Sequence, residues 1–336
     1  MIKRYRSHNY NYNFNMKNGF FQRWGKTLAD DPKYSPFGPE IADIEITSIC
    51  NYGCDYCYKS NTSKGTNMSL DTFSMIIDKL PNTMTQVAFG ADAGAETNPD
   101  LWAMADYCRS KKIVPNITVA DVSDETAVKL SQVMGAVAVS FHGDFDTCYN
   151  NIKKLTDLGM TQINAHFVIH ENSFEEALRF LSDMKSDSRL EKMYAIVFLS
   201  IKQKGRAQTG FQPLSQNKFN QLIDKAREVG VNYGFDSCGS SKFSTYLNSA
   251  KISQEEKIRL ETMIEPCESF GLFSSYFSVD GEYFPCSFAK GCRGWTQGVD
   301  MRNVDNFVEQ VWNGSVINQF REESLGCNRE CLFYKI

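Results

Sequence analysis

Seven short apolar segments alternate with helical patterns between residues 41 and 235, and this alternation limits the fold more than any other feature. The segments are rich in Val, Ile and Phe, as buried parallel strands are. They are residues 41–47, 85–89, 113–119, 136–141, 162–169, 193–200 and 231–235. Six or seven such βα units in about 200 residues favour a complete or partial βα barrel, with an open doubly wound sheet as the alternative. The predicted fold class is α/β.

Helix ends between these segments are marked by typical capping residues. Ser69 precedes one helical run, and Ser173 with Glu176 predicts a capping box before another. Gly135 and Gly230 lie where a left-handed C-terminal cap is expected. The helices should therefore end close to these residues.

The composition changes toward the carboxyl terminus, where residues 265–336 hold five of the eleven cysteines. Short strand-like pieces surround Asp280 and Gly281 in this region. We expect an amino-terminal arm over residues 1–38, a barrel over 39–250 and a small α+β domain over 251–336.

The charge distribution argues against a general affinity for nucleic acid, because the net charge is −4. A local basic segment does exist: Lys3, Arg4, Arg6, Lys17, Arg23 and Lys26 all precede the first acidic residue, Asp30. The prediction is a solvated amino-terminal arm, with phosphate contact as the alternative.

Targeting signals are also missing from the sequence. The apolar runs fall far short of the roughly 20 residues that cross a bilayer, and Asn and Tyr follow the basic amino terminus instead of an apolar segment. We therefore expect a cytoplasmic protein without a membrane partner. Reducing conditions there disfavour disulfides, so the eleven cysteines suggest metal ligation.

The strongest motif is CNYGCDYC at residues 50–57, directly after the first predicted barrel strand. Barrel enzymes place their chemistry at the carboxyl ends of the strands. Three thiolates, from Cys50, Cys54 and Cys57, can hold three irons of a four-iron cluster and leave the fourth iron open. The competing site, structural zinc, normally requires four ligands, and no nearby His or Cys completes such a set.

This motif, in this position, resembles that of the radical S-adenosylmethionine superfamily. The resemblance implies a 4Fe–4S cluster whose open iron binds S-adenosylmethionine. It also implies reductive cleavage of that cofactor to a 5′-deoxyadenosyl radical, with electrons from a flavodoxin- or ferredoxin-type reductant. The radical would take a hydrogen atom from the substrate.

Weaker matches extend the resemblance along the chain. Tyr56 occupies the position at which family members contact the adenine. A degenerate counterpart of the family's Gly-Gly-Glu motif follows the second strand: Gly90, Ala91 and Asp92 are the predicted contacts to the methionine amino group, with Glu96 as an alternative. A plain Gly/Ala turn remains the structural interpretation of this run.

Polar residues at the ends of later strands are further candidates. Ser140 and His142 stand where the family often contacts the ribose or the carboxylate. His166 and His170 have even spacing, which places both on one face of a strand, and a structural role is the alternative for each.

After the sixth strand, Lys202, Lys204 and Arg206 are candidates for binding a carboxylate. Arg206 is the best of them, because a guanidinium can bind both carboxylate oxygens. Solvated charge is the alternative.

The carboxyl-terminal cysteines resemble the auxiliary-cluster region of SPASM and twitch radical enzymes. In the first half of the pattern, thirteen residues separate Cys267 from Gly281, and four residues separate Gly281 from Cys286. The second half consists of Cys327 and Cys331. The resemblance implies one auxiliary 4Fe–4S cluster ligated by these four cysteines. Cys292 is a competing ligand, and a zinc knuckle built from the same four thiols is the alternative.

Cys238 follows the seventh strand, at the reactive end of the predicted barrel. Its thiol is predicted to return a hydrogen atom to a substrate radical, as in radical epimerases. A structural or substrate-positioning thiol is the alternative.

The substrate does not follow from these motifs. The predicted function is radical modification of a peptide, by cross-linking, oxidation or epimerisation. The alternatives are a dehydrogenase or epimerase of a small sugar- or nucleotide-like molecule and, more remotely, a two-cluster electron carrier.

Overall fold

The computed structural model describes residues 1–90 and 97–336. Its largest feature is a ten-stranded sheet in the order β10-β9-β8-β7-β6-β5-β4-β11-β12-β13. The parallel barrel strands are β4 (Ile41–Ile44), β5 (Gln86–Phe89), β6 (Val114–Val119), β7 (Val137–Ser140), β8 (Ile163–Ile169), β9 (Ala195–Ser200) and β10 (Tyr233–Phe235). Every predicted barrel strand is present, so the α/β prediction is confirmed.

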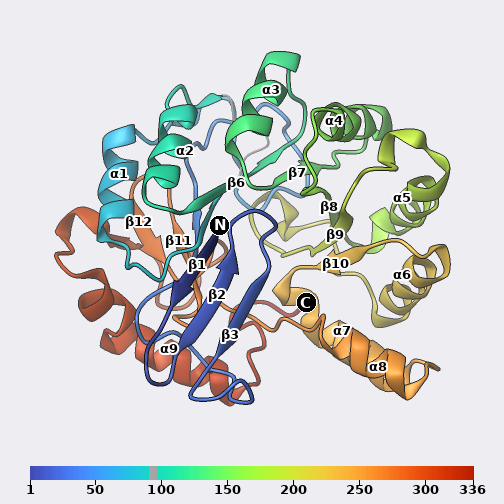
Figure 1. Ribbon diagram of the computed structural model, residues 1–336. Coiled ribbons are helices and arrows are strands. Elements are labelled where there is room, and N and C mark those ends of the chain that lie inside the picture. The colour runs from blue at the N-terminus through green and yellow to red at the C-terminus, as the bar shows by residue number, and fades with distance from the viewer. Residues whose placement is uncertain (91–96) are drawn as a thin grey trace.

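Helices surround the outside of this sheet (Figure 1). They are α1 (Leu70–Lys79), α2 (Leu101–Ser110), α3 (Asp124–Val133), α4 (Phe145–Asp157), α5 (Phe174–Ser186) and α6 (Gln216–Val229), followed by α7 (Ser240–Ser249), α8 (Gln254–Glu261) and α9 (Ser315–Gly326). None of these described helices is long and apolar enough to cross a membrane.

The predicted helix caps are partly correct. The Ser69 hydroxyl accepts a hydrogen bond from Thr72 N, 3.2 Å away, and Gly230 ends α6 in the left-handed conformation with a φ of 70°. The capping box at Ser173 is wrong, because its hydroxyl bonds the backbone of His170 instead. Gly135 does not have a positive φ; a Cβ there would lie 2.2 Å from Val114 Cγ1.

Strand β8 shows how the barrel separates its two faces. Its side chains alternate between buried and partly exposed positions. Phe167 contacts Phe180 of α5, with the ring centroids 6.0 Å apart, so this set faces the helices. Asn164 and His166 alternate with it and therefore lie on the inner face of the barrel. The strand periodicity thus brings polar side chains into the barrel interior.

The carboxyl-terminal region continues the barrel sheet. Strand β11 (Ser274–Phe277) pairs in parallel with β4, and β12 (Glu282–Phe284) and β13 (Val299–Asp300) follow in antiparallel pairs. The boundary predicted at residue 251 falls between α7 and α8. The predicted second domain therefore shares one sheet with the barrel, and β11 lies beside the strand that precedes Cys50.

The amino-terminal segment is folded, although four of its basic residues, Arg4, Arg6, Lys17 and Lys26, are exposed as the prediction of a solvated arm requires. Residues 1–38 contain an antiparallel sheet of β1 (Ile2–Tyr5), β2 (Asn11–Asn15) and β3 (Phe21–Trp24). Tyr10, Tyr12 and Phe14 are at most 1% exposed and pack in a cluster that includes Leu272 and Phe273. Alternating aromatic side chains thus attach the segment to the carboxyl-terminal region.

Candidate functional site

The loop that carries Cys50, Cys54 and Cys57 follows β4 at its carboxyl end. Backbone hydrogen bonds fix both of its ends: Cys50 N donates to Thr62 O at 3.0 Å, and Cys57 N donates to Cys54 O at 3.1 Å. All three cysteines are partly exposed and none forms a disulfide. The loop therefore holds three thiols outside any disulfide at the end of the barrel where chemistry is expected.

The three thiols share one electrostatic environment. Burial raises the pKa of Cys54, and negative charge on Cys50 and Cys57 raises it further. Three thiolates so close together repel one another, and bound iron would remove that repulsion. No three or more His, Cys, Asp or Glu side chains in residues 1–90 and 97–336 are grouped tightly enough to hold one metal ion. An iron–sulfur cluster does not need the three ligands around one ion, because each thiolate binds a separate iron. The three thiols of this loop are the donors that such a cluster requires.

Arg206 connects the loop after β9 to the cysteine loop. Its backbone N donates to Cys57 O at 3.0 Å, and its Nε donates to Cys54 O at 2.8 Å. Nη1 donates to Asn61 O at 3.1 Å, whereas Nη2 is buried without a hydrogen-bond partner. Arg206 therefore holds the cysteine loop by hydrogen bonds to its backbone and retains a donor for a ligand.

Gly205 permits this close approach, and its replacement gives a direct test. It has a φ of 59°, and a Cβ there would lie 2.4 Å from Tyr58 O and 2.6 Å from Cys57 O. Gly205→Ala should displace the loop and lower the iron bound at Cys50, Cys54 and Cys57, measured as iron per chain after anaerobic reconstitution. Gly210→Ala is the matched control, because its φ of 84° carries similar strain of about 1–2 kcal/mol with no atom within 4 Å. Equal iron in the two variants would contradict this role of Gly205.

His142 and Tyr56 lie beside the cysteine loop. His142 Nδ1 is 3.0 Å from Cys54 Sγ and 3.4 Å from the Tyr56 hydroxyl, which donates to Phe141 O at 3.2 Å. The Tyr52 ring stacks on the imidazole at 4.9 Å. Burial lowers the pKa of His142, so the ring is held neutral, and its Nε2 is buried without a partner. The structure thus brings two predicted cofactor residues to the thiols.

Ser140 and His166 lie on neighbouring strands, since β7 and β8 pair them in register. Burial lowers the pKa of His166 to about 4, although the negative charge of Asp236 acts to raise it. His170 lies beyond β8 and packs edge-on against Phe211, with the centroids 5.0 Å apart. Both imidazoles are therefore neutral at pH 7, and His170 has mainly packing contacts.

The predicted contacts of the degenerate glycine motif are only partly within the described residues. Gly90 N donates to Ile44 O at 3.2 Å, which places the start of the motif beside β4. Ala91, Asp92 and the alternative Glu96 lie outside the described residues. Their predicted contact with the methionine amino group stays a prediction.

Two of the predicted auxiliary ligands, Cys267 and Cys331, come from segments that hydrogen bonds join. Cys267 N donates to Arg329 O at 3.3 Å, and Arg329 Nε donates back to Cys267 O at 2.8 Å, two residues before Cys331. Negative charge on Cys267 and Cys331 adds to the burial that raises the pKa of Cys286. These three thiols are therefore close enough to interact electrostatically.

The other two carboxyl-terminal cysteines make different contacts. Cys327 Sγ donates to Ser324 O at 3.4 Å, at the end of α9. Cys292 Sγ lies 3.4 Å from Phe288 O and 3.2 Å from the Tyr334 hydroxyl. Cys108 and Cys148 are buried in helices, as a packing role requires.

The sequence did not indicate two buried ion pairs at this end of the barrel. Lys202, with a side chain that is 3% exposed, binds Asp236 beside Cys238. Lys59 Nζ lies 3.1 Å from Glu45, which also accepts a hydrogen bond from the Tyr276 hydroxyl at 2.6 Å. Glu45 was the available signal for such a pair, because it is a charged residue within the apolar segment predicted as a strand.

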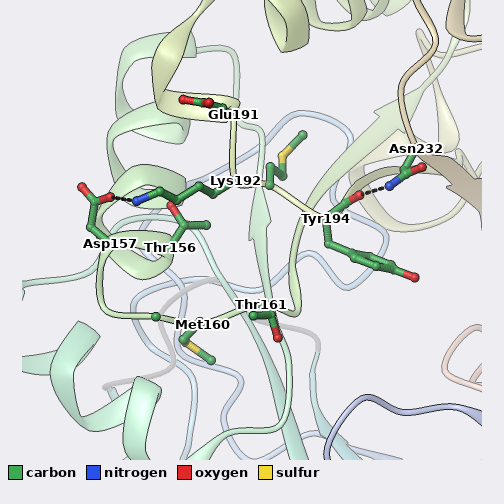
Figure 2. A pocket seen from close by; sticks show the side chains of 10 residues that line it. Thr156, Asp157, Met160, Thr161, Glu191, Lys192, Tyr194 and Asn232 are labelled. Atoms are coloured by element: carbon green, nitrogen blue, oxygen red, sulfur yellow. Dashed lines mark hydrogen bonds and ion pairs between the residues drawn. The ribbon is translucent and has the colours of Figure 1, made fainter.

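An open cavity of about 520 Å³ lies elsewhere, near the starts of β8, β9 and β10 (Figure 2). Lys192 on its rim pairs with Asp157 at 2.9 Å, and Asn232 donates to Tyr194 O at 3.0 Å. These residues precede their strands or end α4, so the cavity is at the opposite end from the thiols. The size of this cavity therefore does not identify it as the functional site.

Comparison with known proteins gives matches in structure. No family model matches the sequence, and no curated protein matches it. Streptococcus suis SuiB bound to the precursor peptide SuiA aligns with 95% of this chain and 90% of that chain, at a TM-score of 0.68 and 12% identity. SuiB bound to S-adenosylmethionine aligns with 85% of this chain and 68% of that chain, at a TM-score of 0.64 and 13% identity. The chain therefore shares the fold of SuiB, with a mostly parallel sheet of alternating strands and helices.

A weaker likeness joins the chain to BtrN in complex with AdoMet and 2-DOIA. It covers 84% of this chain and 86% of that chain, at 12% identity and a TM-score of 0.43. Such a TM-score supports no argument about function.

Proposed function

We propose that a chain with this fold and this cysteine loop is a radical S-adenosylmethionine enzyme. The observation that carries the proposal is the placement of Cys50, Cys54 and Cys57 after β4, in a barrel like that of SuiB. These cysteines would hold a 4Fe–4S cluster. When bound, the cluster supplies the electron that cleaves S-adenosylmethionine, and the resulting radical takes a hydrogen atom from the substrate.

The residues around the loop would bind and orient the cofactor. Arg206 Nη2 and His142 Nε2 are buried without partners, and each such atom costs about 1–3 kcal/mol. Polar groups of S-adenosylmethionine would form hydrogen bonds with these two atoms. Arg206 would bind the carboxylate of the cofactor. The ring of Tyr56 would pack on the adenine, and Ser140 and the Gly90–Asp92 run would supply the remaining contacts.

A second cluster belongs to the proposal. Cys267, Cys286 and Cys331 would be ligands of an auxiliary 4Fe–4S cluster, since their charges interact and their segments are joined. An auxiliary cluster with only protein ligands carries electrons. An external flavodoxin- or ferredoxin-type protein would supply the reductant.

A peptide is the proposed substrate. SuiB, described with a bound precursor peptide, aligns with 95% of this chain. The likeness supports a peptide as the substrate class, and the proposal leaves open whether the product is cross-linked, oxidised or epimerised.

Cofactor cleavage tests the proposal. Anaerobically reconstituted, reduced protein should convert S-adenosylmethionine to 5′-deoxyadenosine, measured by chromatography and mass spectrometry. A short peptide encoded beside this chain's gene should accelerate the cleavage and change in mass. Unchanged cofactor would contradict the enzyme and favour an electron carrier, whereas cleavage accelerated only by a small sugar- or nucleotide-like molecule would contradict the peptide.

The auxiliary site has its own test. Reconstituted wild type should bind about eight irons, and Cys267→Ala combined with Cys331→Ala should bind about four. Slow, uncoupled cleavage of S-adenosylmethionine should remain, because the cysteine loop after β4 is intact. Stoichiometric zinc in place of the lost iron, measured by metal analysis, would contradict an auxiliary iron–sulfur cluster.

A further inference from the structure

Glu45 is a buried carboxylate that lies between β4 and the cysteine loop. Its side chain is 5% exposed, so the carboxylate needs partners from the protein. The Tyr276 hydroxyl donates to its Oε2 at 2.6 Å, and Val279 N donates to the same oxygen at 3.3 Å. The Lys59 ammonium lies 3.1 Å from that oxygen. Three donors from two other parts of the chain therefore converge on one oxygen atom.

The ion pair between Glu45 and Lys59 closes the cysteine loop at its base. Glu45 precedes Cys50, Lys59 follows Cys57, and Cys54 lies between them. The Lys59 side chain is 12% exposed, and salt screens a partly buried pair much less than an exposed one. The pair therefore joins the two ends of the segment that carries all three thiols.

Tyr276 connects this ion pair to the carboxyl-terminal region. It lies in β11, which pairs in parallel with β4, and it is 2% exposed. Its hydroxyl accepts a hydrogen bond from Lys59 Nζ and donates one to Glu45, so it acts as both acceptor and donor. The ammonium also lies 4.4 Å from the centre of the Tyr276 ring. Glu45, Lys59 and Tyr276 therefore form a clamp on the cysteine loop.

A second contact joins the same two regions. The Tyr58 ring packs against the Phe288 ring, with the centroids 4.5 Å apart. Lys204 Nζ donates to Phe288 O at 2.9 Å, which holds Phe288 beside the loop after β9. The two residues that directly follow Cys57 therefore contact the carboxyl-terminal region at two places, Phe288 and Tyr276.

We propose that Tyr276 is a positioning residue for the radical site: through Glu45 and Lys59 it holds the cysteine loop in the geometry that binds S-adenosylmethionine. The inference rests on the proposed function for the identity of that cofactor. Side chains that orient metal ligands from outside alter binding at the metal, and a site is only as well ordered as the residues that support it. The carboxyl-terminal region would thus shape the radical site in addition to supplying auxiliary ligands.

Hydrogen–deuterium exchange of the iron-free full chain tests the clamp without any cluster. Tyr276→Phe removes one hydroxyl, so the peptide covering residues 45–60 should exchange about tenfold faster, the lower end of the effect expected for a hydrogen bond to a charged group. Tyr283→Phe is the matched control. Tyr283 lies on the neighbouring strand β12, is 0% exposed, and its hydroxyl has no hydrogen-bond partner among the described residues. Equal exchange of the loop in wild type and both variants would overturn the inference.

Cofactor binding gives a readout that is specific to the radical site. In the reduced, reconstituted full chain, S-adenosylmethionine should change the electron paramagnetic resonance spectrum. The concentration that gives half of this change should rise about tenfold in Tyr276→Phe, as for outer partners of metal sites, and should not rise in Tyr283→Phe. Unchanged cofactor binding in Tyr276→Phe would overturn the inference. A wild-type spectrum that does not respond to the cofactor would contradict the proposed function instead, and the exchange measurement would still decide on the clamp.

Lys59→Met is a second variant of the same clamp, for the case in which Tyr276→Phe disturbs the whole fold. It removes the ammonium and keeps most of the aliphatic stem. The increase in exchange should again be confined to the cysteine loop and the adjoining ends of β4 and β11. Faster exchange throughout the chain in both variants would give these residues a merely structural role and overturn the inference.

Discussion

Replacing Cys50, Cys54 and Cys57 together by Ala should remove about half of the bound iron and all cleavage of S-adenosylmethionine. The three thiols lie on one loop, where their charges interact, and the proposed function assigns the cofactor-binding iron to them. Without that iron no electron reaches the cofactor. Iron per chain and 5′-deoxyadenosine, both measured after anaerobic reconstitution, check the two parts.

The auxiliary site supplies the control for this triple variant. Its cluster should keep its spectrum, because Cys267, Cys286 and Cys331 belong to segments held by separate hydrogen bonds. A variant that loses all iron has failed to fold or to be reconstituted, which circular dichroism distinguishes. Residual 5′-deoxyadenosine above that of a protein-free control would contradict the assignment of the radical cluster.

The barrel strands could be predicted because each is a local apolar pattern with its own periodicity. The position of β11 could not be predicted in this way. Its pairing with β4 joins residues more than 230 apart in sequence, as for Ser274 with Ile41, and nothing local specifies that partner. The same limit applies to β12 and β13, which continue the sheet from β11.

The amino-terminal sheet was predictable in principle. Tyr10, Tyr12 and Phe14 alternate with Asn, which is the period of a half-buried strand. The basic residues suggested a solvated segment instead. Four of these basic residues are exposed, but Arg23 is not, because its guanidinium lies 3.5 Å from the centre of the Phe273 ring and pairs with a buried carboxylate.

For the candidate site, sequence spacing identified the thiols but not what surrounds them. Cys50, Cys54 and Cys57 are close in sequence, so their shared loop follows from the motif. The contact of Lys202 with Asp236 joins two loops 34 residues apart, and the contact of Arg206 with Cys54 spans 152 residues. Such pairs depend on strand order, which the apolar pattern does not determine.

Replacing Arg23 by Ala should destabilise the whole protein by about 3–5 kcal/mol, the cost of leaving a buried charge without its partner. Arg23 Nε donates to Glu40 Oε1 at 2.7 Å, and the Glu40 side chain is 1% exposed. Tyr10 also hydrogen-bonds this carboxylate. The free energy of unfolding in urea measures the loss.

The pH dependence of this loss has a defined sign. Burial raises the pKa of Glu40 above its usual value of 4.5, and Arg23 opposes the rise. Without Arg23 the folded-state pKa should rise further, so the variant takes up a proton on folding. Its stability relative to wild type should therefore fall as pH increases from the folded-state pKa of Glu40 in wild type, itself above 4.5, to the higher pKa in the variant.

Lys111→Ala is the matched control, since Lys111 and Asp78 form an ion pair at 2.6 Å whose side chains are 44% and 49% exposed. Exposed pairs contribute about 0–1 kcal/mol, so this variant should remain close to wild type. Equal small losses in the two variants would mean that the Arg23–Glu40 pair does not hold the amino-terminal sheet on the barrel. A large loss for Arg23→Ala alone, accompanied by a single unfolding transition, makes residues 1–38 part of the folded core.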